Sequence, residues 1–389
     1  MFPNLSYLIQ YFTGVNIPFL QIFQSFGFCV AIAFIFGYWA FAEEFKRKEK
    51  LGYIHPFEKT ITVGAPASLT ELLLNGLFGF ILGYKLIDAA LNFSALQNDT
   101  QGFLLSLRGN WIGGILGAIG FAYWAYYESK KHELPKPETK RVTVHPYELM
   151  GSILLWAAIC GFAGAKIFNA LENWGDFLKD PVGMLIGLSG LTFYGGLICG
   201  GAAVLYIARK NGISPLNMLD IGGPGMMLAY GIGRIGCQMS GDGDWGVINM
   251  SPKPHWLSWA PDWMWAFKFP HNVNNVGVDM PGCTGKFCRE LAFPVFPTSF
   301  YESVVCILLF FFLWKIRNRI KVPGVLFGVY MILAGVERFF IELIRVNTKY
   351  HVLGISFTQA ELISIFMVAG GIVLCYPQFK KKVTVTKHG

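Results

Sequence analysis

The sequence predicts an all-α polytopic membrane protein, and three observations predict it. Hydrophobic residues make up 53% of the chain and charged residues only 14%, with a mean hydropathy of +0.45. Soluble domains carry roughly 25% charge. Apolar stretches long enough to cross about 30 Å of hydrocarbon recur along the chain. The loops between these stretches are alternately rich and poor in Lys and Arg, as the positive-inside rule requires.

About nine stretches are predicted to be transmembrane helices. They cover residues 18–42, 69–92, 111–127, 151–171, 183–207, 216–239, 299–314, 324–344 and 356–376. The third is short and rich in glycine, and the sixth is a candidate for a broken helix. Most of the 32 Lys and Arg residues fall in alternate loops and in the tail from 378. We therefore expect a periplasmic N-terminus and a cytoplasmic C-terminus.

An internal repeat with a spacing of about 80–85 residues occupies the first half. YWAFAEEFKRKE from Tyr38 is similar to YWAYYESKKHE from Tyr123, and FILGYKLIDA at 80–89 is similar to GFAGAKIFNA at 161–170. The pattern predicts a duplicated pair of spans. Transporters also contain repeats, so the repeat alone does not identify a function.

Residues 240–298 form the long polar segment on the predicted periplasmic side. Its five tryptophans are typical either of a subdomain lying on lipid headgroups or of a small aromatic core. Cys283 and Cys288 lie close together within it, and a local disulfide is our first interpretation. A zinc site needs four closely spaced ligands, which this loop does not supply. The other six cysteines lie in or beside apolar spans and are expected to pack there.

Arg234 is the most informative charged residue, because it lies in the apolar, glycine-rich run YGIGRIGCQMSGDGDWG. An arginine at that depth is costly and marks a functional site by default. It is either structural, pairing with an aspartate, or a cation for a phospholipid phosphate. Arg338 and Glu342 are four residues apart and so share a helix face. They form either a self-neutralising pair or a second charged wall facing Arg234.

Three further side chains have both a structural and a functional interpretation. Asp242 and Asp244 precede or follow glycine, which is ordinary turn chemistry, but either carboxylate can orient Arg234. Tyr194 begins an apolar span beside two glycines, so it is either an interfacial residue or a hydrogen-bonding partner of a ligand. None of the seven histidines falls in a predicted span, so a buried imidazole base is not expected. No nucleic-acid-binding pattern is found, and the charge of +8 fits cytoplasmic anchoring.

These residues, in this order, resemble the prolipoprotein diacylglyceryl transferase family. The resemblance runs from about residue 150 to 377, with a weaker match over the first span. Its pieces are GFAGAKIF, LTFYGGLICGG, LDIGGPGMMLAYGIGRIGCQMSGDGDWG, FPTSFYES, PGVLFGVYMILAGVERFFIELIR and ISFTQAELISIFMVAGG. The segment from about 50 to 145 is then an insertion of two extra spans in a single membrane domain of residues 1–389.

The resemblance implies transfer of a diacylglyceryl group from phosphatidylglycerol to the lipobox cysteine of a prolipoprotein signal peptide. A thioether forms and glycerol phosphate is released, without a metal or organic cofactor. The implied location is the bacterial inner membrane, with the active site toward the outer leaflet. The implied catalytic residues are Arg338, Glu342, Tyr194, Asp242 and Asp244. The implied substrate-binding residues are Arg234, Gly233, Gly236, Ser240, Gly246, Tyr301 and Glu302.

The sequence also departs from the family pattern. Many members have histidine where Tyr194 stands, and asparagine where Cys237 and Ser240 stand. The acidic turn is one residue longer, so either Asp242 or Asp244 replaces the family's glutamate. The general base is therefore left open.

The alternative function is a multi-span anion or lipid transporter without covalent chemistry. Lys85, Lys166 and the two arginines Arg234 and Arg338 would then line an anion path. A scaffold that only presents the polar loop would leave the arginines within the spans unexplained.

Overall fold

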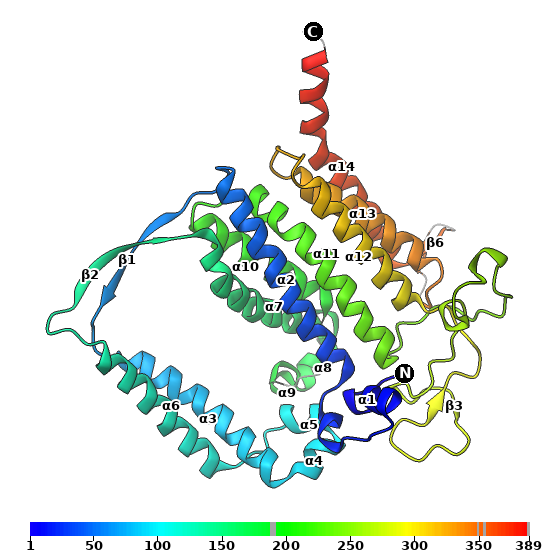
Figure 1. The fold of residues 1–389 in the computed structure, drawn as a ribbon, viewed down its shortest axis with the longest axis horizontal. Coiled ribbons are helices and arrows are strands. Elements are labelled where there is room, and N and C mark those ends of the chain that lie inside the picture. The colour runs from blue at the N-terminus through cyan, green and yellow to red at the C-terminus, as the bar shows by residue number, and fades with distance from the viewer. Residues whose placement is uncertain (187–191, 348–349, 353–354, 387–389) are drawn as a thin grey trace. The chain divides into compact units, whose positions relative to one another are not determined.

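The computed structural model describes residues 1–186, 192–347, 350–352 and 355–386 (Figure 1). Part of the predicted span 183–207 lies outside the described residues. The chain forms two compact units. The first comprises Met1–His55, Leu149–Ala157 and Gly201–Gly389, and the second comprises Pro56–Glu148 and Ala158–Gly200.

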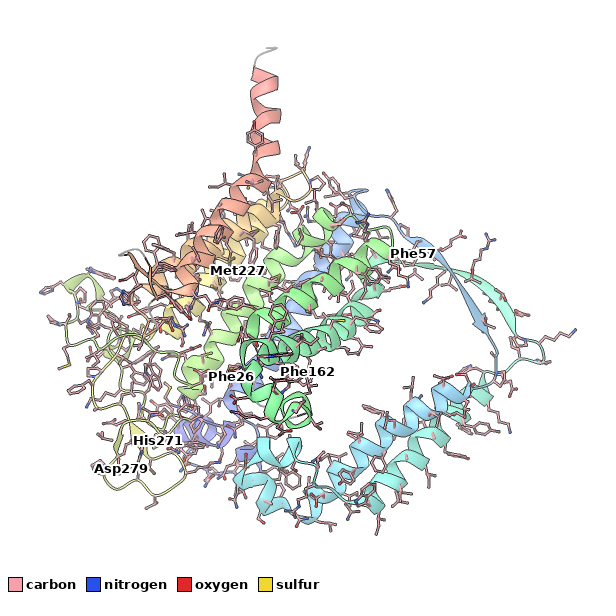
Figure 2. The ribbon with its side chains drawn as sticks, turned by 180° about the vertical axis from the view of Figure 1, so that it is seen from behind. Phe26, Phe57, Phe162, Met227, His271 and Asp279 are labelled. Atoms are coloured by element: carbon pink, nitrogen blue, oxygen red, sulfur yellow. A yellow bond between two sulfur atoms is a disulfide. The ribbon has the colours of Figure 1, made fainter. Side chains whose placement is uncertain are left out.

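The first unit is built around helix α11 (Pro215–Ser240), against which α2 (Ser25–Lys50), α12 (Thr298–Ile316) and α13 (Val325–Glu342) pack. Helix α14 (Gln359–Thr386) packs on α13, while α1 (Leu5–Thr13) and η1 (Pro18–Ile22) precede α2. The core joins Met227 of α11, labelled in Figure 2, to Phe310 of α12 and Leu326 of α13. This packing fixes the ends of α11, α12 and α13 relative to one another.

Helix α11 is continuous, so the expectation of a broken helix is wrong. Pro224 lies inside it, and glycines on both sides are buried. A Cβ atom on Gly225 would lie 2.4 Å from the Phe41 ring, and one on Gly223 would lie 3.2 Å from Cβ of Tyr330. These glycines therefore permit close helix packing rather than a break, and neighbouring helices help a membrane helix to tolerate proline. Gly241 ends the helix with a left-handed φ of 64°.

The second unit contains two hairpins of the same design. The first runs through α3 (Leu69–Leu91), α4 (Phe93–Asn98), α5 (Thr100–Leu105) and α6 (Trp111–Lys131). The other runs through α7 (Met150–Glu172), α8 (Trp174–Lys179), α9 (Pro181–Ile186) and α10 (Phe193–Lys210), although α7 and α10 also contribute residues to the first unit. A short η2 (Pro146–Leu149) precedes α7.

Glycines bring the backbones of α3 and α6 together. A Cβ atom on Gly117 would lie 2.1 Å from the carbonyl oxygen of Gly79, and one on Gly83 would lie 2.2 Å from that of Gly113. Only glycine fits at such an approach, which is a common way to pack membrane helices.

In the described residues, three two-stranded antiparallel sheets correct the all-α prediction in detail. They pair β1 (Phe57–Val63) with β2 (Glu138–Val144), β3 (Val278–Asp279) with β4 (Arg289–Glu290), and β5 (Tyr350–Val352) with β6 (Ile355–Phe357). In the first sheet Thr60 faces Arg141 and Thr62 faces Thr139. The β-branched residues of FEKTITV and ETKRVTV favour strands, a signal that the sequence interpretation did not use.

The chain is a helical membrane protein. Among the described residues, five segments are long and apolar enough to cross a membrane: Ser25–Lys50, Leu69–Leu91, Pro146–Glu172, Thr298–Ile316 and Gln359–Tyr376. Each overlaps a predicted span. The four remaining predicted spans correspond to α6, α10, α11 and α13, and membrane crossing by these helices stays a prediction.

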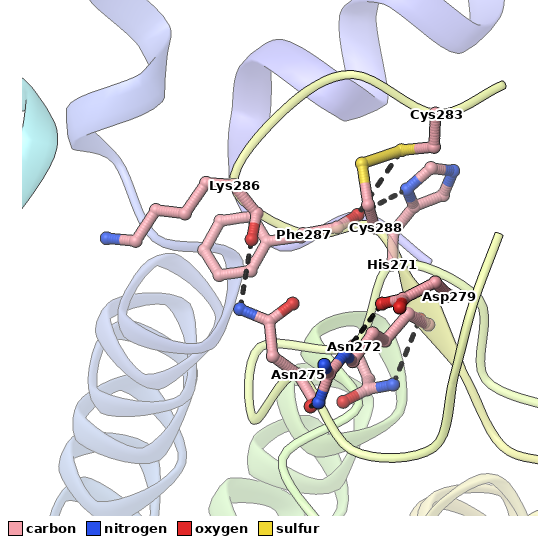
Figure 3. Close-up of a disulfide and its surroundings, with 9 residues drawn as sticks. His271, Asn272, Asn275, Asp279, Cys283, Lys286, Phe287 and Cys288 are labelled. Carbon is pink, nitrogen blue, oxygen red and sulfur yellow. Dashed lines mark hydrogen bonds and ion pairs between the residues drawn. A yellow bond between two sulfur atoms is a disulfide. The ribbon is translucent and has the colours of Figure 1, made fainter.

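The polar segment 240–298 contains η3 (His255–Leu257), η4 (Asp262–Met264) and a small core around Phe269, Leu291 and Val295. Trp245 packs against this core, whereas Trp256 and Trp259 are exposed. The aromatic-core interpretation therefore holds for Trp245, whereas contact of the exposed tryptophans with lipid headgroups stays a prediction. The predicted disulfide between Cys283 and Cys288 is confirmed, and His271 accompanies it by contacting the Phe287 carbonyl oxygen at 2.7 Å (Figure 3).

Candidate functional site

Six charged side chains meet where α11 ends, α12 begins and α13 ends in the first unit. We call them the arginine cluster: Arg234, Asp244, Glu302, Arg338, Glu342 and Arg345. Because three helix ends converge there, residues more than 100 positions apart in the sequence become neighbours. The cluster contains three guanidinium groups and three carboxylates.

Glu302 is the centre of the cluster, and its side chain has 0% exposure. Arg234 Nε lies 2.9 Å from its Oε2, Arg338 Nη1 lies 3.0 Å from its Oε1, and Arg345 Nη1 lies 3.5 Å from the same Oε1. One buried carboxylate therefore holds all three arginines. Its contacts position the arginines, and the predicted contact of Glu302 with substrate stays a prediction.

Arg338 is held on a second side by Glu342. Its Nη2 lies 2.9 Å from Glu342 Oε2, as the spacing of four residues predicted. Asn347 Nδ2 donates to the other oxygen of Glu342 at 2.6 Å. Arg338 and Glu342 are therefore not an isolated ion pair. Arg338 also contacts Glu302, which in turn contacts Arg234.

Arg234 and Arg345 share the carboxylate of Asp244, each guanidinium contacting a different oxygen. Arg234 also donates from Nη2 to the Tyr230 hydroxyl at 3.0 Å and lies over the Tyr230 ring. Asp242 makes a turn instead, because its Oδ1 accepts a hydrogen bond from the Asp244 amide at 3.3 Å. Of the two candidate aspartates, Asp244 is the one that contacts the arginines.

The charge of Asp244 follows from this arrangement. Burial raises the pKa of this carboxyl, but Arg234 and Arg345 outweigh burial and hold the pKa below its usual value. Asp244 is therefore ionised at neutral pH. Its side chain remains 32% exposed, unlike those of Glu302 and Glu342, which are buried.

Two other predicted binding residues are used in packing. Tyr301 donates its hydroxyl proton to the Met264 carbonyl oxygen at 2.7 Å and so ties α12 to the polar segment. Ser240 is buried, and its hydroxyl donates to the Cys237 carbonyl oxygen at 3.3 Å. Direct contact of either residue with substrate stays a prediction.

The three candidate glycines lie in different surroundings. A Cβ atom on Gly236 would meet Cys29 at 3.0 Å, and one on Gly246 would lie 2.5 Å from the Ile344 carbonyl oxygen. These two glycines allow close approach of α2 to α11 and of the acidic turn to the end of α13. A Cβ atom on Gly233 would have nothing within 4 Å. Open space therefore exists beside Gly233, one residue before Arg234.

That space belongs to an apolar cavity of about 340 Å³ in the first unit. Its walls come from α2, α11 and the beginning of α7, together with Val204 of α10, and Gly233 lies among the lining residues. The described lining is apolar apart from Tyr38, and Gly233 is the lining residue nearest to Arg234 in sequence.

Tyr194 lies near the start of α10 in the second unit and is half-buried. The interpretation that its glycines open space is wrong for Gly195. A Cβ atom there would lie 2.4 Å from the Gly164 carbonyl oxygen, so this glycine allows close packing of α7 and α10. A catalytic role for Tyr194 stays a prediction.

The two lysines of the transporter hypothesis bind carbonyl groups of their own hairpins. Lys85 Nζ donates to the carbonyl oxygens of Phe103 at 3.0 Å and Arg108 at 2.7 Å, and Lys166 Nζ donates to that of Met184 at 3.2 Å. These contacts explain two intramembrane lysines as structural caps, which weakens the case for an anion path.

Sequence reasoning missed two members of the site. Arg345 was not assigned a role from the sequence, yet it contacts both Asp244 and Glu302. Its separation of seven residues from Arg338 was the available signal. Tyr230 is four residues before Arg234 and follows the same helical spacing. Among possible metal ligands in the described part of the chain, only Cys237, Asp242 and Asp244 offer atoms within 4.8 Å of one another, and Asp244 is already bound by two arginines.

Comparison with known proteins identifies the family. Residues 114–376 match the model of the family described as prolipoprotein diacylglyceryl transferase. A phosphatidylglycerol–prolipoprotein diacylglyceryl transferase from Staphylococcus carnosus is 30% identical over 62% of this chain and 79% of its own length. The enzyme of the same description from Lactobacillus acidophilus is 28% identical over 72% of this chain and 89% of its own length. The chain belongs to the prolipoprotein diacylglyceryl transferase family.

Proposed function

We propose that this transferase binds the phosphate of phosphatidylglycerol at the arginine cluster and transfers the diacylglyceryl group to the lipobox cysteine of a prolipoprotein. The observation that carries the proposal is the convergence of Arg234 and Arg338 on one buried carboxylate, Glu302. Guanidinium groups match phosphate oxygens in geometry and charge. Glu302 holds both guanidinium groups in fixed positions at one place in the fold.

The reaction is a displacement at carbon. The cysteine sulfur forms a bond to the glyceryl carbon that carries the phosphate ester. The bond between that carbon and the ester oxygen breaks, and its electron pair leaves with glycerol phosphate. The cysteine thiol loses its proton, and the phosphate monoester that leaves has one more negative charge than the phosphodiester. The proton and this charge cancel, so the reaction is balanced. The developing charge is the one that fixed donors in a dry site stabilise most.

Arg234 and Arg338 divide the work in this proposal. Arg234 stabilises the leaving phosphate, and Arg338 favours the thiolate, because a nearby cation lowers the pKa of a thiol from about 8.5. Glu342 holds Arg338 by the 2.9 Å contact or relays the thiol proton. Tyr194 remains a candidate for the proton acceptor.

The apolar cavity beside Gly233 is proposed to take an acyl chain of the lipid. It is lined by residues such as Val30, Phe34 and Ile153, together with Gly233, which precedes Arg234 in α11. An acyl chain that moves from the bilayer into this cavity exchanges one apolar environment for another, so its packing orients the lipid rather than supplying hydrophobic free energy. The acyl chain and the phosphate would then bind at adjacent positions on α11.

We also infer that residues 50–145 are a two-span insertion that duplicates the following hairpin. Lys85 and Lys166 both cap loop carbonyls from the first helix of their hairpin. Asp99 and Asp180 both accept a hydrogen bond at 2.9 Å from the amide of a glycine three residues later. The same offset of about 81 residues relates both pairs, which supports duplication.

The proposed placement is the bacterial inner membrane. Nine spans, a periplasmic N-terminus and a site toward the outer leaflet follow from the charge asymmetry of the loops. In that orientation the polar segment 240–298 and the arginine cluster face the periplasm, where a lipobox cysteine arrives. A cysteine-scanning label at loop positions checks each side.

The test is transfer of labelled diacylglycerol from phosphatidylglycerol to a synthetic lipobox peptide by the purified full-length protein. We expect a thioether-linked product from the wild type and none from a peptide whose cysteine is replaced by alanine. Arg234→Ala should lower the rate about 10²–10³-fold, as for loss of an oxyanion donor. Undiminished transfer by folded Arg234→Ala would contradict the assigned role.

A further inference from the structure

Asp244 differs from the other carboxylates of the arginine cluster in the partners of its two oxygens and in its exposure to water. One oxygen contacts Arg234 and the other contacts Arg345, and no other pair of arginines in the described residues shares a carboxylate that is partly exposed. A phosphodiester has the same two features, namely one negative charge and two non-bridging oxygens. Asp244 therefore presents the arginines with the charge and oxygen pattern of the lipid phosphate.

Resting on the proposed function, we propose that Asp244 is a placeholder for the substrate phosphate, and that Arg345 together with Arg234 binds this phosphate once Asp244 turns away. Arg345 thereby becomes a phosphate ligand that the sequence did not assign. Arg338 remains held by Glu302 and Glu342.

The contacts of Arg338 explain why it is not the partner of Arg234 in this step. Both its terminal nitrogens face buried carboxylates, Glu302 at 3.0 Å and Glu342 at 2.9 Å. Neither carboxylate can move to water, because both are buried. Separating either pair would leave an unpaired buried charge, which costs several kcal/mol.

Charge balance points to the same exchange. The cluster holds three arginines and three carboxylates, so a phosphate added to it would leave one negative charge in excess. Asp244 is the carboxylate with access to water, at 32% exposure. Its departure restores the balance without burying an uncompensated charge.

The backbone of Asp244 allows this movement by side-chain rotation alone. Its carbonyl oxygen accepts hydrogen bonds from the Thr298 hydroxyl at 2.8 Å and the Ser299 hydroxyl at 2.7 Å. The main chain is thus fixed to the start of α12, while the side chain reaches the arginines from the water side. Rotation about its first side-chain torsion exchanges the carboxylate for the phosphate.

The test measures binding of glycerol phosphate, the product that carries the phosphate group, to full-length protein by titration calorimetry. We expect Asp244→Asn to bind it about tenfold more tightly, because the competing charge is removed while the side-chain volume is kept. Arg345→Gln should weaken binding by a similar factor. In the double variant the gain from Asp244→Asn should disappear, because the released guanidinium is absent.

Controls separate this exchange from a general charge effect. Asp262→Asn removes one negative charge from the same polar segment, at a carboxylate paired with Lys253 and 91% exposed. An equal gain in Asp262→Asn, no detectable binding to Asp244→Asn, or a gain that survives in the double variant would overturn the proposal. Asp244→Ser and Arg345→Lys repeat the cycle if a first variant does not fold. Failure of the proposed function would appear differently, as no labelled peptide from the wild type.

Discussion

In the described residues of the first unit, arginines surround a fully buried glutamate at two places, Glu44 and Glu302. The two places differ in whether a partly exposed carboxylate also binds the arginines. In the Glu44 cluster, Arg47 and Arg317 both contact Glu44, and Arg47 also donates to the Arg317 carbonyl oxygen at 3.2 Å. The Arg317 guanidinium lies 3.1 Å from the centre of the Trp314 ring. These residues tie α2 to the end of α12, with no partly exposed carboxylate among them.

The arginine cluster repeats the central arrangement but adds a carboxylate that can leave. Glu302 corresponds to Glu44 as the buried centre, while Asp244 binds two of the arginines from the water side. A buried ion cluster therefore does not by itself identify a catalytic site. What distinguishes the two is a partly exposed carboxylate, Asp244, that two arginines share.

Replacing one arginine in each cluster gives the largest expected contrast. Arg338→Ala should lower diacylglyceryl transfer about 10²-fold or more, because it removes a donor from the reaction. Arg317→Ala should instead lower the unfolding temperature and leave the rate per folded molecule within about threefold of the wild type. Transfer assays and thermal unfolding on the same samples decide. A rate loss in folded Arg317→Ala as large as that in Arg338→Ala would remove the distinction.

Replacing the central glutamates should also separate the two clusters, with a smaller change in transfer rate than replacing the arginines. Glu44→Gln leaves two arginines without their shared anion and should cost about 3 kcal/mol of folding free energy. Glu302→Gln should cost less stability, because Asp244 and Glu342 still neutralise its arginines. It should lower transfer about tenfold through misplaced guanidinium groups. Denaturant unfolding and transfer rates measure the two quantities, and equal stability losses would contradict the comparison.

The smallest expected effect is a response of Asp244 to acid. The pKa of Asp244 lies below its usual value in the folded protein, because Arg234 and Arg345 outweigh burial. Its stabilising contribution is therefore complete above the unfolded pKa of about 3.9 and is lost as the pH falls through the folded value. Thermal unfolding between pH 7 and strong acid should show this step in the wild type. Its persistence in Asp244→Asn would assign the step to another group.

The sequence revealed the parts of the site that violate the membrane pattern. Arg234 and Arg338 stood out because charge in an apolar span is costly, and helical spacing placed Glu342 beside Arg338. Arg345 was missed because it lies beyond the predicted span, where an arginine is ordinary. The choice between Asp242 and Asp244 depended on a turn whose direction is set by hydrogen bonds to Thr298 and Ser299. No local pattern encodes those contacts.

The fold, like the site, was predictable where a local sequence pattern exists and not where tertiary contacts decide. Long apolar stretches predicted the helices. The expected break in 216–239 was wrong, because tertiary packing on the glycines that flank Pro224 keeps the helix continuous. The β1–β2 pairing joins strands about 80 residues apart, and the β-branched residues within it were treated as loop. The hairpin repeat was visible in the sequence. The contacts of Lys85 and Lys166 with loop carbonyl oxygens depend on the conformation of loops 18 residues away, which no local pattern encodes.

The disulfide between Cys283 and Cys288 has a consequence for the reacting thiol. Such bonds persist in oxidising compartments, and the segment that carries this one leads directly from the turn of Asp244 to the start of α12. We therefore expect the incoming cysteine to meet the enzyme where unprotected thiols are converted to mixed disulfides and sulfenic acids. Alkylation to a thioether ends that exposure, since a carbon–sulfur bond takes no part in thiol exchange, so prompt modification also preserves the cysteine chemically.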